Sequence, residues 1–131
     1  MQNWTALFSS YTHSGVYPAG REKASGLKTA AAACNLAVIV VKLRRAADKE
    51  GLLAALARDM DFPQYFGRNW DALHDCLTDL SWKPAQGYVI YFEGFGAFEK
   101  TDPADARTAR QIFDSCADFW KQKAVPFFMV V

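Results

Sequence analysis

The chain has 131 residues, of which 51% are hydrophobic and 15% aromatic, and its formal net charge is +1. This composition is typical of one globular domain and excludes a largely disordered chain. The near-neutral charge also excludes a strongly basic nucleic-acid-binding protein, so we expect no direct contact with nucleic acid.

Charge is distributed unevenly along the chain. Residues 1–58 contain eight Lys or Arg against three acidic residues, whereas residues 59–80 contain one Arg against five Asp. Residues 81–131 are balanced, with six residues of each sign. This regional asymmetry predicts a protein with an oriented electric field and an acidic pole.

The cysteines and the N-terminal residues bear on the cellular compartment in which the protein is expected. Three cysteines, an odd number without C-x-x-C spacing, favour a reducing environment. The first residues lack the basic and apolar regions of a signal peptide, and the longest apolar run, residues 30–41, is too short to cross a bilayer. We therefore expect a cytoplasmic protein that does not contact membranes.

Residues 1–34 are expected to form an N-terminal extension packed on the rest of the chain. A short surface helix is predicted from four apolar side chains at helical spacing, namely Trp4, Leu7, Phe8 and Tyr11. Residues 15–18 are predicted to form an edge strand, because Pro18 is tolerated only at an edge or a strand end. An Ala-rich helix is predicted from about Ser25 to Cys34, with Asn35 closing it.

Residues 35–131 are expected to form the main domain. Its first element, Leu36–Leu43, is a nearly continuous apolar run rich in β-branched residues, which predicts a central strand buried on both faces. Asp48 is expected to cap a helix that ends before Asp61 and Pro63.

The second half of the chain predicts two more strands and a long helix. Gly87–Glu93 is expected to be a central strand, with residues 94–96 forming the turn after it. Asp102 followed by Pro103 predicts the start of the long helix, and residues 126–131 a final buried strand. Strands separated by helices imply an α/β fold: a small parallel sheet of three central strands plus an N-terminal edge strand, packed with helices.

The stretch from Asp61 to Leu80 combines a turn, a helix start and an acidic helical face. Gly67 is expected to adopt a positive φ in the turn, and Asn69 to cap a helix that begins near Trp70. At 100° per residue one face of this helix is apolar and carries Trp70, Leu73, Leu77 and Leu80. The opposite face carries Asp71, Asp75 and Asp79, with His74 and Thr78 beside them.

Three stacked carboxylates cost the helix roughly 0.2–0.5 kcal/mol for each like-charged pair. Two interpretations of this face remain open. It is either an acidic stripe made tolerable by water and salt, or a surface shaped to meet a cationic partner.

An enzymatic interpretation has few groups to use. Cys76 lies two residues after His74, about 200° away around the helix, so the thiol faces the packed side and cannot reach the imidazole. Asp71, His74 and Asp75 could share a face, but three ligands on one helix without a second cluster are weak grounds for a metal site. Residues 94–96 lack the third glycine and the lysine of phosphate-binding loops. We expect no catalytic residue, no metal and no cofactor.

The motif Tyr65-Phe66-Gly67-x-Asn69-x-Asp71-Ala72-Leu73-x-Asp75-Cys76-Leu77-Thr78 resembles the signature of the barstar family. Members of this family are small intracellular inhibitors that block the active site of a secreted ribonuclease with an acidic helix and its preceding loop. The resemblance runs from about Ala37 to the C-terminus. It implies a barstar-like parallel sheet with packed helices, and a non-enzymatic immunity protein, or antitoxin, that binds a cognate ribonuclease in a one-to-one complex.

The resemblance also implies a set of partner-binding residues centred on Asp75: Tyr65, Gly67, Asn69, Asp71, His74, Asp75, Thr78, Asp79 and Asp118. Three positions depart from the family pattern. His74 stands where an aromatic residue is usual, Arg68 replaces an acid, and Asp79 replaces a glycine. The alternative is a module with the same fold that binds another cationic protein, either a non-ribonuclease toxin or a regulator.

Overall fold

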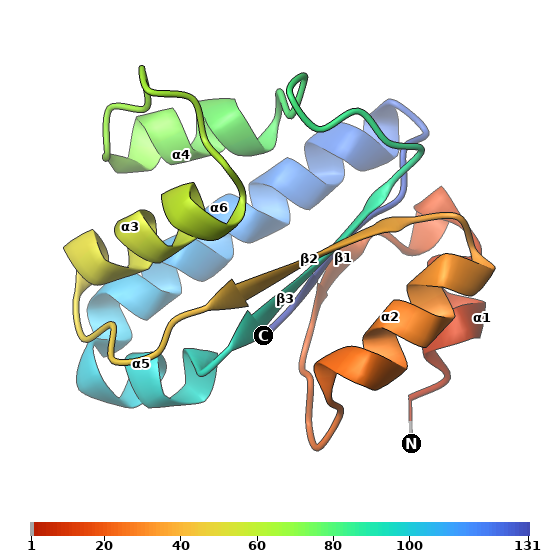
Figure 1. Ribbon diagram of the computed structural model, residues 1–131, viewed down its shortest axis with the longest axis horizontal. Helices are drawn as coiled ribbons and strands as arrows, with labels where there is room; N and C mark the ends of the chain where they lie inside the picture. The colour runs from red at the N-terminus through yellow and green to blue at the C-terminus, as the bar shows by residue number, and fades with distance from the viewer. Residues whose placement is uncertain (1) are drawn as a thin grey trace.

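The computed structural model describes residues 2–131, which form one four-stranded parallel sheet with helices on both faces (Figure 1). The strand order across the sheet is β1 (Gly15–Tyr17), β4 (Phe127–Val130), β3 (Tyr88–Glu93) and β2 (Ala37–Lys42). One face is covered by α1 (Trp4–Phe8) and α2 (Ala24–Ala33). The other face is covered by α3 (Lys49–Asp59), α4 (Trp70–Leu77), α5 (Phe95–Thr101) and α6 (Pro103–Gln122). The predicted α/β class is confirmed.

The two inner strands explain why both faces need helices. Successive side chains of a strand point to opposite faces, and in β4 every one of them is buried. Phe127 and Met129 pack in the larger core with α3 to α6, whereas Phe128 and Val130 pack in the smaller core with α1 and α2. A strand that is apolar on both faces is stable only in the middle of a covered sheet.

The N-terminal residues build the smaller core. Trp4 and Phe8 of α1 are buried, and the Phe8 ring lies 4.9 Å from that of Phe128 on β4. Tyr17 of β1 accepts a hydrogen bond from the N–H of Val131 at 2.9 Å, which ties the edge strand to the chain end. The short helix and the edge strand are confirmed. Tyr11 does not share the helical face as expected: the helix ends at Phe8, and Tyr11 lies 40% exposed in the following 3-10 turn, η1 (Tyr11–His13).

Strand β2 differs from its prediction because it forms the second edge of the sheet. Asn35 closes α2 as expected, with φ of 59° and a hydrogen bond of 2.9 Å from the Leu36 N–H to the Ala31 carbonyl. The strand that follows pairs only with β3, and several of its side chains are half-buried. A run of β-branched residues therefore indicated a strand correctly but not its position in the sheet.

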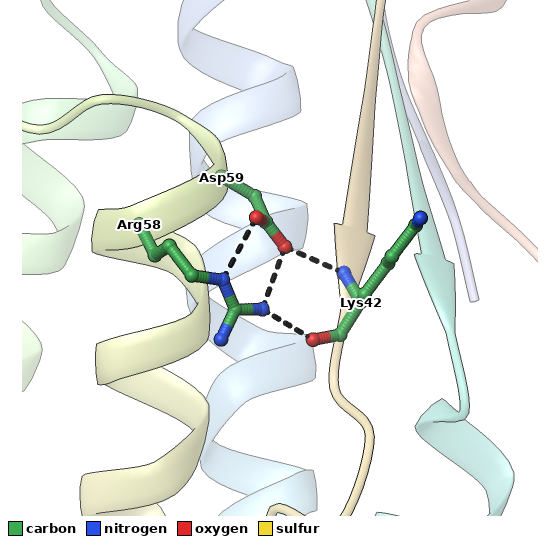
Figure 2. A network of polar contacts seen from close by, with 3 residues as sticks. All are labelled: Lys42, Arg58 and Asp59. Atoms are coloured by element: carbon green, nitrogen blue, oxygen red, sulfur yellow. Dashed lines mark hydrogen bonds and ion pairs between the residues drawn. The ribbon is translucent and has the colours of Figure 1, made fainter.

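The outer edge of β2 is covered at its end by two side chains of α3, as Figure 2 shows. The Lys42 N–H donates to Asp59 at 2.7 Å, and the Lys42 carbonyl accepts from the Arg58 guanidinium at 2.6 Å. Arg58 also donates to Asp59 twice, at 2.9 and 2.8 Å. The outward backbone groups of Lys42 are thus satisfied by side chains, as a neighbouring strand would satisfy them.

Helix α5 was not predicted. Residues 94–96 were expected to be a plain turn, but Gly94 alone makes it, with φ of 95°, and a helix starts at Phe95. Phe95 and Phe98, three residues apart, are both buried in the larger core. The burial of this aromatic pair outweighs the low helix propensity of Gly96, which lies exposed inside the helix. Asp102 then caps α6, as expected.

Neutralising Asp59 tests the network at the edge of β2. Hydrogen bonding from Arg58 lowers the pKa of Asp59 below its ordinary value, so this carboxylate stabilises the fold at neutral pH and loses that effect as the pH falls through its folded-state pKa. Asp59→Asn should reduce the free energy of unfolding by about 1–2 kcal/mol at pH 7. The difference from the wild type should shrink below about pH 4, which urea unfolding at several pH values would measure.

Asp61→Asn is the matched control. Asp61 pairs with Lys83 at 2.8 Å, but its side chain is 70% exposed. Its neutralisation should change the stability by less than about 0.5 kcal/mol. A loss at Asp59 that does not depend on pH would contradict the electrostatic account.

Candidate functional site

Helix α4 begins where the sequence predicts, and its start is fixed by one side chain. Asn69 has an extended backbone with φ of −136°, and its side-chain oxygen accepts a hydrogen bond from the Ala72 N–H at 2.7 Å. Asp71 lies in the first turn, where the positive end of the helix dipole favours a carboxylate. The predicted N-cap is confirmed.

The turn before α4 differs from the prediction. Arg68, not Gly67, adopts the positive φ, with a value of 52°. Gly67 relieves crowding instead: a Cβ at this position would lie a tight 3.3 Å from the amide nitrogen of Asn69 and 3.6 Å from the Cβ of Ala72. The missing side chain leaves room for the capping Asn69, whose amide nitrogen lies 3.4 Å from the Gly67 carbonyl oxygen.

The two faces of α4 separate as expected along most of its length. Leu73, Cys76 and Leu77 are buried, whereas Asp71 and Asp75 are exposed. The third carboxylate is placed differently, because α4 ends at Leu77. Asp79 is exposed in the turn after the helix and is not part of its i, i+4 stripe.

Two local features end the helix before Asp79. The Thr78 hydroxyl donates back to the His74 carbonyl at 2.8 Å. Leu80 then adopts a φ of 52°, and its N–H donates to the Cys76 carbonyl at 3.2 Å. A residue in the left-handed conformation after the last helical turn is a common helix stop, usually made by glycine.

Helix α4 is held on α6 by two hydrogen bonds from residues distant in sequence. The His74 imidazole lies 3.2 Å from the Ser115 hydroxyl, and the Trp120 indole N–H donates to the Leu77 carbonyl at 2.8 Å. Asp118 is exposed on α6 between these two contacts. The fold therefore brings the part of α6 that carries Asp118 next to α4, although the two segments are about forty residues apart.

The loop before α4 presents one aromatic side chain to solvent and packs another. Tyr65 is 74% exposed, whereas Phe66 is half-buried with its ring 4.9 Å from that of Phe62. Phe62 in turn meets Trp82, whose indole donates to the Met60 carbonyl at 3.0 Å. The inward aromatic residues anchor a loop whose tip is available to a partner.

The geometry offers little to a nucleophilic enzyme or a metal site. Burial raises the pKa of the Cys76 thiol, with smaller contributions from Asp79 and Asp75, and the His74 ring meets Ser115 and not the thiol. Residues 2–131 contain no cluster of three or more His, Cys, Asp or Glu side chains placed to hold a metal ion. In the same part of the chain, every helix is too short or too polar to span a bilayer.

A family model described as Barstar (barnase inhibitor) matches residues 36–131, well over half of the chain. The chain belongs to the barstar family. The barstar match begins directly before β2 and includes α4, its preceding loop and all of α6. No curated protein matches the chain. Because barstar proteins are inhibitors of a ribonuclease, membership assigns this chain to a class of inhibitor proteins and not to a class of enzymes.

Sequence reasoning did not find every residue that supports the candidate site. Ser115 and Trp120 hold α4 in place, but neither was singled out for that role. Both contacts span more than forty residues, and no local pattern reports a contact of that length. The only available signal was the resemblance, which placed Asp118 near the acidic helix.

The reactivity of the three cysteine thiols provides a test of the packing around α4 and α6. All three cysteines are free, with Cys34 half-buried and Cys76 and Cys116 buried. Burial raises the pKa of Cys116 to about 12, so its reactive thiolate is scarce near neutrality. In the native protein at pH 8, one thiol should react rapidly with an aromatic disulfide reagent, and the other two only after unfolding.

Cys34→Ser should abolish the rapid reaction and leave the slow thiols unchanged. Absorbance of the released thiolate would count the reactive groups in each state. Rapid reaction of all three thiols in the folded protein would contradict the burial of Cys76 and Cys116.

Proposed function

We propose that this barstar-family chain is an intracellular immunity protein that blocks the active site of a cognate ribonuclease, one to one, with α4 and the loop before it. The inhibitory surface is defined by Tyr65, Gly67, Asn69, Asp71, His74, Asp75, Thr78, Asp79 and Asp118. It combines the loop, the exposed side of α4 and one acid of α6. The proposal places the chain in the cytoplasm of the cell that makes the ribonuclease.

The observation that carries this proposal is the set of unpaired carboxylates on the surface. The three ion pairs within residues 2–131 are Arg58–Asp59, Lys83–Asp61 and Arg110–Glu99, and all lie elsewhere. Asp71, Asp75 and Asp118 are exposed and have no cation within 4.0 Å in the described chain. Acids kept apart from internal cations are free to bind the cations of another protein.

The mechanism follows from the chemistry of the ribonuclease. An active site that cleaves RNA must be cationic, because it holds phosphates and the negative charge of a transition state. The carboxylates of Asp71 and Asp75 can take the positions of phosphates there and accept charge-assisted hydrogen bonds from Arg and Lys side chains. The exposed Tyr65 would close the rim, and RNA would then be excluded because its site is occupied.

The inhibitory surface is built before the partner arrives, which favours tight binding. Asn69 fixes the start of α4, and α6 fixes its C-terminal half through Ser115 and Trp120. Ordering a mobile helix on binding would reduce the affinity, whereas this helix is already docked.

We further propose that residues 1–34 are an addition to a barstar-like domain of residues 35–131. They supply β1, α1 and α2, which lie at one edge and on the opposite face of the sheet from α4 (Figure 1). Their surface excess of Lys and Arg would also repel a cationic active site. Their role is to complete the smaller core and not to contact the ribonuclease.

The proposed function is tested by adding the purified chain to a panel of secreted microbial ribonucleases that includes barnase. Cleavage of a fluorogenic RNA would report inhibition, and calorimetry would report the stoichiometry. Inhibition of at least one enzyme at a one-to-one ratio supports the proposal. Binding to a ribonuclease without inhibition, or no binding to any, would favour the alternative of a non-ribonuclease toxin or regulator.

Asp75→Ala should separate binding from stability. Asp75 lies mid-face on α4 and should be the most desolvated carboxylate in the complex, so its loss leaves partner cations unpaired. The affinity should fall by roughly 2–5 kcal/mol, a range to which the barnase–barstar pair itself contributes. Stability should be unchanged or slightly higher, because repulsion from Asp71 is relieved. Inhibition constants and denaturant midpoints would measure the two effects.

Leu77→Ala is the control for this experiment. Leu77 is fully buried, so its truncation should cost roughly 2–5 kcal/mol of stability. If Asp75→Ala instead destabilises the fold and leaves inhibition intact, the acidic face is structural and the proposed mechanism loses its central residue.

Phe8→Ala tests the proposed role of the N-terminal segment. Phe8 is 1% exposed in the smaller core, so the truncation should cost about 3–5 kcal/mol of stability. Inhibition measured well below the unfolding temperature should change by less than about tenfold. Tyr11→Ala, at an exposed position, should change neither property. A loss of inhibition by a still-folded Phe8→Ala variant would show that this segment supports the inhibitory surface.

A further inference from the structure

One cationic side chain, Arg68, lies within the acidic stretch of residues 59–80. Arg68 is the single Arg or Lys between residues 59 and 80, where five Asp occur. Its side chain is exposed, and no ion pair or hydrogen bond joins its guanidinium to any other residue of the described chain 2–131. It stands between Gly67 and Asn69, inside the proposed inhibitory surface.

The backbone holds Arg68 in an unfavourable conformation. Its φ of 52° lies in the left-handed region, where glycine or asparagine is normally found. Both flanks are fixed, because Asn69 caps α4 and the Phe66 N–H donates to the Pro63 carbonyl at 3.0 Å. Arg68 is thus presented from a defined position on the loop.

A small cavity lies beside this side chain. The cavity has a volume of about 180 Å³ and is lined by Glu50 and Leu53 of α3 and by Arg68. Glu50 is an available internal counter-charge, yet its carboxylate does not come within the 4.0 Å of an ion pair. The guanidinium therefore keeps its five donors for another molecule.

We propose that Arg68 is a specificity-determining contact, and that the ribonuclease carries an Asp or Glu carboxylate on the rim of its cationic cleft, facing this residue. The inference rests on the proposed function. A guanidinium covered by a partner without a counter-charge would weaken the complex, whereas a carboxylate can accept two parallel hydrogen bonds from it. Because the partner's cleft must itself be cationic, this acid distinguishes one ribonuclease from another by its rim.

The proposal predicts that removal of Arg68 weakens binding, whereas long-range repulsion from a cationic cleft alone predicts that its removal strengthens binding. If the partner surface around Arg68 were cationic like the cleft, Arg68 would oppose association, and its removal would strengthen binding. If the surface carries a carboxylate, its removal weakens binding. The direction of the change therefore decides between the two.

The test compares Arg68→Gln and Arg68→Glu with the wild type against the same ribonuclease panel that includes barnase. For each enzyme inhibited by the wild type, Arg68→Gln should raise the inhibition constant by about tenfold and Arg68→Glu by about a hundredfold. Lys28→Gln makes the same charge change at an exposed position of α2, across the sheet from α4, and should leave the constant within about twofold. Equal or tighter inhibition by Arg68→Gln would overturn the proposal.

A second variant excludes misfolding as the cause. Arg68→Gly suits the left-handed backbone, so its melting temperature should equal or exceed that of the wild type while inhibition weakens as in Arg68→Gln. A wild type that inhibits no ribonuclease would overturn the proposed function and this inference together. A wild type that inhibits, with Arg68 variants that inhibit equally well, would overturn this inference alone.

Discussion

The docking of α4 on α6 is the constraint on which the candidate site depends. The Trp120 indole binds the carbonyl of Leu77, and Leu73 and Leu77 are fully buried beneath the helix. These contacts leave the helix one orientation, because rotating it would bury carboxylates and expose leucines. The acidic side must therefore face outward, and the part of α6 that carries the exposed Asp118 lies next to α4. Apolar packing beneath α4 therefore determines which side of the helix presents its carboxylates to solvent.

The exposed carboxylates of α4 reduce the stability of the helix slightly. Asp71 and Asp75 repel each other one turn apart, and no cation of the described chain is placed to offset them. The ion pairs of the described residues, Arg58–Asp59, Lys83–Asp61 and Arg110–Glu99, all lie away from these two carboxylates. The two cores, in which aromatic residues from the sheet and helices pack together, stabilise the fold against this repulsion.

Local chemistry predicted much of the fold, and non-local packing explains what it missed. Asn35, Asp48 and Asn69 end or start helices as expected, because capping depends on a few neighbouring atoms. The position of β2 at a sheet edge and the existence of α5 depend on which surfaces meet, and no single segment contains that information. The exposure of Asp71 and Asp75 on α4 was predicted from their spacing, whereas the end of the helix before Asp79 and the contact with Ser115 depend on the folded chain.

The side chains that cover the end of β2 have a consequence for the protein before it meets a partner. In a parallel strand alternate residues direct their backbone groups outward, so the free edge of β2 offers Val38, Val40 and Lys42 to an added strand. Arg58 and Asp59 already occupy the groups of Lys42. An incoming strand could pair only with Val38 and Val40 before it met the side chains of Arg58 and Asp59. Two paired residues are too few for a stable β-ladder. The Lys42 network thereby disfavours strand addition at the β2 edge of the sheet.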